Sequence, residues 1–145
     1  MDTPKQIINE LLVEVFNQIL SIEQENLKQR GITLSMNEVH VLEAIVKTEP
    51  PTMTNIATRL RVTTGTLTTA VNRLVEKGYV ERERLEEDKR RVMVSITKKA
   101  YDVLRIHDQF HDEMIDATIK DMKLDEDELL LQSLYNLKEY FKHKY

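Results

Sequence analysis

The chain has 145 residues, of which 41% are hydrophobic and 32% charged, with no cysteine and a net charge of −4. This composition predicts one globular domain with a buried core, and it excludes disulfides and thiolate metal sites. The sequence contains neither a basic-then-apolar leader nor an apolar run of about 18 residues, so we expect a cytoplasmic protein without a membrane partner.

The charged residues are unevenly distributed along the chain. Thr52 to Lys99 contains 11 Lys and Arg against 6 Asp and Glu, a net charge of +5, whereas the remaining residues carry −9. A basic middle between acidic flanks suits a protein that places one face on phosphates while the remainder keeps it soluble.

Apolar periodicity predicts helices over the first half of the chain. One long helix is expected from Pro4 to about Gln29, with an apolar arc so wide that the domain core or a second chain must cover it. Ser35, with Glu38 three residues later, forms a capping box for the next helix, which the prolines at 50–51 terminate.

The middle of the chain predicts two short helices and a hairpin. Thr52 caps a helix that ends at Leu60, residues 61–63 form a turn, and Thr63 or Thr64 caps a helix to Lys77. Alternating residues at 79–84 and 92–97 predict a β-hairpin with a charged tip.

A second long helix is expected from Lys98 to about Met122, and Asp125 is expected to cap a last helix. Two short helices followed by a hairpin are typical of a winged helix-turn-helix. The fold class is therefore predicted as α+β, mostly α, with long N- and C-terminal helices around the winged segment.

The helix over residues 63–77 has one apolar and one polar face. An exposed face that is rich in Thr and has no Glu or Lys in its first three turns is unusual for solvation alone, because Thr is a poor helix former. Thr methyls can touch the thymine methyl, and Asn72 can pair with adenine, so this face suits the major groove; the alternative is a Thr-rich surface helix. The core face is predicted to consist of Leu67, Ala70, Val71, Leu74 and Val75.

The hairpin tip carries three consecutive basic residues. An Arg on a narrow loop can enter a minor groove, and Asp88 would then hold Arg90 or Arg91 extended; the alternative is a solvated loop of mixed charge. The predicted DNA contacts are Thr54, Thr63, Thr64, Gly65, Thr66, Thr68, Thr69, Asn72, Arg73, Arg82, Arg84, Asp88, Lys89, Arg90 and Arg91.

The segment LVEKGYVERERLEEDKRRVMVSITKKA resembles the wing of the MarR (multiple-antibiotic-resistance regulator) family, with matches at Asp88, Arg90, Ile96 and Thr97. Ala100 stands where the family usually has Gly. The resemblance covers the whole chain. It implies a homodimer in which each winged lobe binds half of a pseudo-palindromic operator on double-stranded DNA. Residues 1–145 would then form a single MarR-type domain, with a DNA-binding lobe at 35–99 and a dimerisation lobe at 1–30 and 100–145.

Further segments resemble one branch of this family, the repressors of fatty-acid biosynthesis genes in streptococci and their relatives. They are VFNQILSIEQENL, NEVHVLEAI, RVTTGTLTTAVNRLVEKGY and IHDQFHDEM. The resemblance implies repression of such genes with long-chain acyl-acyl-carrier-protein as co-repressor. The alternative is a sensor of zinc or another small ligand that controls different genes, or whose main output is a contact with a protein such as the acyl-carrier protein.

Histidines form the one candidate metal site. His107 and His111 are four residues apart on a predicted helix, and His40 and Glu23 could complete a set that resembles that of zinc-sensing MarR members. The alternative is a polar cluster under the dimer, and we expect no required cofactor. Without Cys, a Gly-rich phosphate loop or a Ser elbow, the chain is not expected to be an enzyme.

Overall fold

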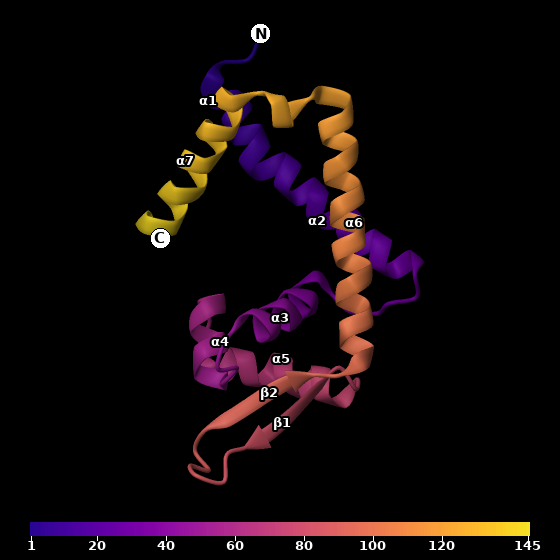
Figure 1. The fold of residues 1–145 in the computed structure, drawn as a ribbon, viewed down its shortest axis with the longest axis vertical. Coiled ribbons are helices and arrows are strands. Elements are labelled where there is room, and N and C mark those ends of the chain that lie inside the picture. The colour runs from indigo at the N-terminus through magenta and orange to yellow at the C-terminus, as the bar shows by residue number, and fades with distance from the viewer. The chain divides into compact units, whose positions relative to one another are not determined.

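The computed structural model describes residues 1–145, which fall into two compact units, Met1–His107 and Asp108–Tyr145 (Figure 1). The first unit contains α1 (Pro4–Asn9), the π-helical stretch η1 (Glu10–Val15), α2 (Phe16–Gln29), α3 (Met36–Lys47), α4 (Met53–Leu60), α5 (Thr64–Glu76), β1 (Val80–Arg84), β2 (Val92–Ile96) and the start of α6 (Lys98–Met122). The second unit contains the rest of α6, the 3-10 turn η2 (Leu124–Glu126) and α7 (Glu128–Lys144). The predicted class, mostly helical with one hairpin, is confirmed.

The first predicted helix is continuous but not uniformly α-helical. Thr3 caps it in a capping box with Gln6, as the local sequence favours. The one long helix that was predicted is present, but between Glu10 and Val15 its backbone adopts π-helical hydrogen bonding. A π-helical turn inserts extra residues and rotates the following apolar positions around the axis, which the spacing of apolar residues alone did not indicate.

The three predicted N-caps of the winged segment are confirmed. Ser35 and Glu38 form the expected capping box at α3, the Thr52 hydroxyl accepts from the backbone N–H of Asn55, and the Thr63 hydroxyl accepts from that of Thr66. Arg61 ends α4 with a left-handed φ of 58°, so it adopts the conformation for which many helix-turn-helix proteins use Gly.

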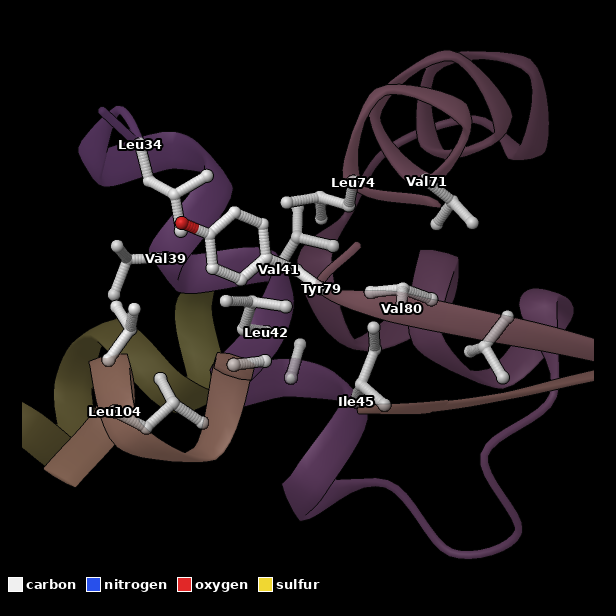
Figure 2. Close-up of a cluster of buried hydrophobic side chains, with 14 of the residues drawn as sticks. Leu34, Val39, Val41, Leu42, Ile45, Val71, Leu74, Tyr79, Val80 and Leu104 are labelled. Carbon is white, nitrogen blue, oxygen red and sulfur yellow. The ribbon is translucent and has the colours of Figure 1, made fainter. Parts of the chain in front are cut away.

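The core of the first unit lies where α3, α5 and the start of the hairpin meet. Figure 2 shows Leu42 and Ile45 of α3 beside Leu74 of α5 and Val80 of β1. The predicted inner face of α5 is confirmed, because Leu67, Val71 and Leu74 are buried and Ala70 and Val75 pack against them. This packing fixes which face of α5 is left exposed.

The hairpin is antiparallel, with Val80 opposite Ile96 and Arg84 opposite Val92. A connection that was not predicted joins it to the start of α4. The N–H of Val94 donates to the carbonyl oxygen of Pro51 at 3.0 Å, and Thr52 forms an isolated bridge with Met93. The N-cap of α4 is thereby attached to strand β2.

The start of the last helix differs from the prediction. Asp125 lies inside η2, and Asp127 is the N-cap of α7, with its Oδ1 accepting from the N–H of Leu130 at 3.0 Å. Lys123 adopts a left-handed φ of 51° after α6, and the 3-10 turn that follows delays the new helix by two residues. None of the helices is both long enough and apolar enough to cross a membrane.

Candidate nucleic-acid interface

The polar face of α5 is exposed as predicted. Thr64, Gly65, Thr68, Asn72 and Arg73 are all exposed, on the side of the helix opposite its buried leucines. The helix begins at Thr63, whose hydroxyl satisfies one of the N–H groups of the first turn. The remaining N–H groups of that turn point beyond the end of the helix, where they can bind a phosphate.

Hydrogen bonds within α5 determine what its Thr hydroxyls can offer. The Thr68 hydroxyl donates to the carbonyl oxygen of Thr64 at 2.7 Å, and that of Thr69 donates to Gly65 at 3.2 Å. Because each hydroxyl has a single proton, these two groups show only lone pairs and a methyl to a partner. They suit the amino groups of adenine or cytosine and the thymine methyl.

Strand β1 carries its basic side chains on one side and its acidic side chains on the other. Successive side chains point to opposite sides of a strand, so Arg82 and Arg84 share the side of the buried Val80, while Glu81 and Glu83 point away. Both arginines line a hollow of about 460 Å³ between the hairpin and the helices, together with Met53, Thr68 and Val92. Guanidinium groups beside an exposed Thr are suited to binding a phosphate backbone.

The structure joins two of the predicted DNA contacts to each other. Nη1 of Arg82 donates a hydrogen bond to Oδ1 of Asn72, so strand β1 and helix α5 meet at their exposed polar side chains. Both residues were predicted DNA contacts, but their hydrogen bond to each other was not predicted.

The wing tip is ordered by Asp88. Its Oδ1 accepts from Nε of Arg90 at 3.1 Å and from the backbone N–H of Arg90 at 3.0 Å. These hydrogen bonds, with the charge of Arg91, lower the pKa of the Asp88 carboxyl. Asp88 therefore orients Arg90 in the structure, and Lys89 and Arg91 remain exposed beside it.

A second hollow of about 300 Å³ lies between the wing and the start of α4, lined by Arg90, Arg91, Val92 and residues 52–55. It includes Thr54, which was predicted, and Asn55, which was not. Asn55 Nδ2 donates to the carbonyl oxygen of Pro50 at 3.1 Å, so this side chain is fixed at the same edge. The signal that could have indicated Asn55 was its place in the first turn of α4, next to the predicted contact Thr54.

The histidines do not all lie in equivalent surroundings. His107 is buried on α6, with Nε2 3.3 Å from Oε1 of Glu43, a residue of α3 that the sequence analysis had not singled out. The hydrogen bond from His107 lowers the pKa of Glu43 against the opposing effect of burial. Glu23 is buried on α2, His40 is half-buried on α3, and His111 lies one turn beyond His107, in the second unit. Metal binding by these residues stays a prediction.

Replacing Gly65 with Ala should stabilise the protein by about 0.5–1 kcal/mol and weaken DNA binding. A Cβ at this position meets nothing nearer than Thr63 Oγ1 at 3.9 Å, so the helix has room for it, whereas the added methyl projects from the predicted DNA-binding face. Chemical denaturation and a titration with operator DNA measure the two effects separately.

Gly78→Ala is the matched control, because its φ of 83° places Ala in the left-handed region and should lower stability instead. If Gly65→Ala bound DNA as tightly as the parent protein, close approach of DNA to this part of α5 would be contradicted.

These features define a winged helix-turn-helix of the DNA-binding kind: a capped polar helix, a hairpin with an oriented Arg, and basic hollows between them. Residues 34–92 match the model of the MarR family, and similarity to a solved member extends along almost the whole chain. The chain belongs to the MarR family, as the resemblance predicted, and it is a DNA-binding transcriptional regulator.

Three relatives illustrate the similarity. The crystal structure of Streptococcus pneumoniae FabT in complex with DNA superposes with a TM-score of 0.85 and 36% identity, covering 97% of this chain and 99% of FabT. Two uncharacterised HTH-type transcriptional regulators of Bacillus subtilis are also similar: YpoP is 34% identical over 66% of this chain, and YhjH is 28% identical over 54%. The matches span 65% of YpoP and 45% of YhjH, less than two thirds of each. The similarity to FabT supports the predicted branch.

Proposed function

We propose that the protein represses fatty-acid biosynthesis genes by binding a pseudo-palindromic operator as a homodimer. The observation that carries the proposal is the common exposed side of α5 and β1, where Thr68 lines the same hollow as Arg82 and Arg84. Helix α5 enters the major groove, and Arg90 or Arg91 enters the adjacent minor groove. The similarity to FabT, which was solved with DNA, supports both the docking and the choice of target genes.

Dimerisation is supported by a group of exposed apolar side chains near the N-terminus. Across α1, η1 and the first residue of α2 the exposed fractions range from 38% at Val15 to 56% at Phe16. The residues are Ile7, Ile8, Leu11, Leu12, Val13, Val15 and Phe16. A contiguous apolar surface of this kind is typical of a protein interface, and a second copy would cover it symmetrically. Two-fold symmetry would in turn match a pseudo-palindromic operator.

The proposed co-repressor is long-chain acyl-acyl-carrier-protein, whose acidic carrier would dock on the basic side of the molecule. The support is the overall similarity to FabT and the concentration of positive charge between Thr52 and Lys99. Selection of genomic DNA fragments with and without this ligand tests the proposal. Enrichment of fatty-acid gene promoters that increases with the ligand is expected, and enrichment of unrelated promoters only would contradict the proposed targets. Elemental analysis of the purified protein tests zinc, the alternative signal.

Replacing Arg90 with Ala should weaken binding to all sequences alike and make affinity less dependent on salt. An Arg that neutralises one phosphate releases about one counterion, so the slope of log affinity against log salt should fall by about 1. Titrations at several salt concentrations measure the slope.

Lys142→Ala removes a positive charge from the last turn of α7, outside the predicted interface, and should leave the slope unchanged. An unaltered slope in the Arg90 variant would show that the wing tip does not approach the DNA backbone.

A further inference from the structure

We propose that Arg82 is a positioning residue that sets the base specificity of Asn72. By donating to one of the two lone pairs of Asn72 Oδ1, the Arg82 guanidinium turns this oxygen toward β1 and leaves the amide NH₂ as the main group offered to DNA. Asn72 then favours a base edge with hydrogen-bond acceptors over the two-bond pair with adenine. This inference rests on the proposed function, since it concerns how the same helix selects its operator.

The orientation of the amide follows from the chemistry of its partner. A guanidinium carries five N–H donors and no acceptor, so only the oxygen of the Asn72 amide can face it. The oxygen and the nitrogen of an amide occupy the same space after a half-turn of the group, so its hydrogen-bond partner determines which way it faces. Here that partner is Arg82. The two donor hydrogens of Nδ2 are left for another partner.

The position of both side chains keeps this pair available to DNA. Asn72 lies on the exposed face of α5 and Arg82 is exposed on β1. Because side chains alternate along a strand, Glu81 and Glu83 point to the side of β1 opposite Arg82. Their carboxylates therefore do not compete with Asn72 for the Arg82 guanidinium. The hollow that Arg82 lines also includes Thr68, one turn before Asn72 on the same helix.

The consequence concerns which bases are favoured. The two-bond pair with adenine requires the amide oxygen to accept from the N6 amino group while Nδ2 donates to N7. Arg82 uses one of the two lone pairs of Oδ1 and holds this oxygen toward β1, so its acceptance from the adenine N6 amino group is weakened. The Nδ2 donors are unaffected and fit N7 and O6 of guanine or O4 of thymine. Adenine thereby loses part of the advantage that the two-bond pair gives it over those bases.

Selection from a library of randomised DNA duplexes, followed by sequencing, tests this proposal with the full-length protein and its variants. Arg82→Met keeps the length of the side chain and removes the donors. We expect it to raise the relative preference for adenine at one symmetry-related pair of positions by roughly fivefold, the effect of one strengthened base contact. In an Asn72→Ala background the same substitution should leave the base preference unchanged, because the two residues act through one hydrogen bond.

Arg84→Met is the matched control, since Arg84 lies two residues further on the same side of β1 and lines the same hollow. It should lower affinity without changing preference at any single position. Thermal unfolding of each variant establishes that it is folded, and Arg82→Lys, which keeps one donor group, should retain the parental preference.

Two results distinguish failure of this inference from failure of the proposed function. If Arg82→Met lowered affinity uniformly and kept the parental base preference, Arg82 would be a phosphate contact and the inference would be overturned, while the protein remained a sequence-specific regulator. If the parent protein enriched no sequence from the library, the operator-binding function itself would be contradicted.

Discussion

Replacing Ile8 and Leu12 together with glutamate should separate the proposed dimer into monomers and lower operator affinity by about a hundredfold or more, the contribution of joining two binding modules. The two side chains are 51% and 41% exposed in the single chain and lie four residues apart. In a dimer that covers them, two carboxylates would be buried without partners, which is costly. Light scattering after size-exclusion chromatography gives the oligomeric state, and a gel shift gives the affinity.

Val46→Glu is the matched control, because Val46 is 55% exposed on α3, away from the N-terminal apolar surface. It should leave the protein dimeric. A dimer that survives the double substitution would rule out this surface as the interface, and operator binding by a stable monomer would contradict the proposed symmetric docking.

Leu74→Ala should lower the free energy of unfolding by about 2–5 kcal/mol, the range for removing a buried leucine side chain. Leu74 is fully buried and attaches α5 to the core beside Val80 (Figure 2). The cavity would loosen the helix that carries the predicted base contacts, so operator affinity should fall with stability. Urea denaturation at a fixed protein concentration measures the loss, since dimer stability depends on concentration.

Thr69→Ala on the opposite face of α5 provides the comparison. Its hydroxyl is exposed and bonded only to a carbonyl of its own helix, so stability should change by no more than about 0.5 kcal/mol. Affinity for the operator should nevertheless fall. If both variants lost stability equally, the assignment of one buried and one DNA-binding face to α5 would be wrong.

The parts of the fold that sequence predicted depend on neighbouring residues. The N-caps at Ser35, Thr52 and Thr63 each bond within three residues, so the local pattern was sufficient. The inner face of α5 followed from helical spacing, and the hairpin from alternation. The face left exposed by that packing is the predicted DNA-binding surface.

The features that sequence did not predict depend on contacts between separate segments, or on a choice between neighbouring residues of the same kind. Asp125 and Asp127 could both cap a helix, and the 3-10 turn that follows the left-handed Lys123 makes Asp127 the N-cap. The bridge between Thr52 and Met93 joins segments far apart in the chain. The pairing of Arg82 with Asn72 depends on side-chain rotamers at the junction of helix and strand. No spacing rule connects these positions.

The alternation of basic and acidic side chains along β1 limits which insertions and deletions this strand can tolerate. Insertion of one residue between the buried Val80 and Glu81 would shift the rest of the strand by one residue against β2 and turn the carboxylates of Glu81 and Glu83 toward the predicted DNA-binding side. The loop at residues 85–91 lies outside both strands, so a change in its length does not alter which side of the hairpin each strand residue faces. Variation in wing length among descendants of this sequence should therefore be confined to that loop.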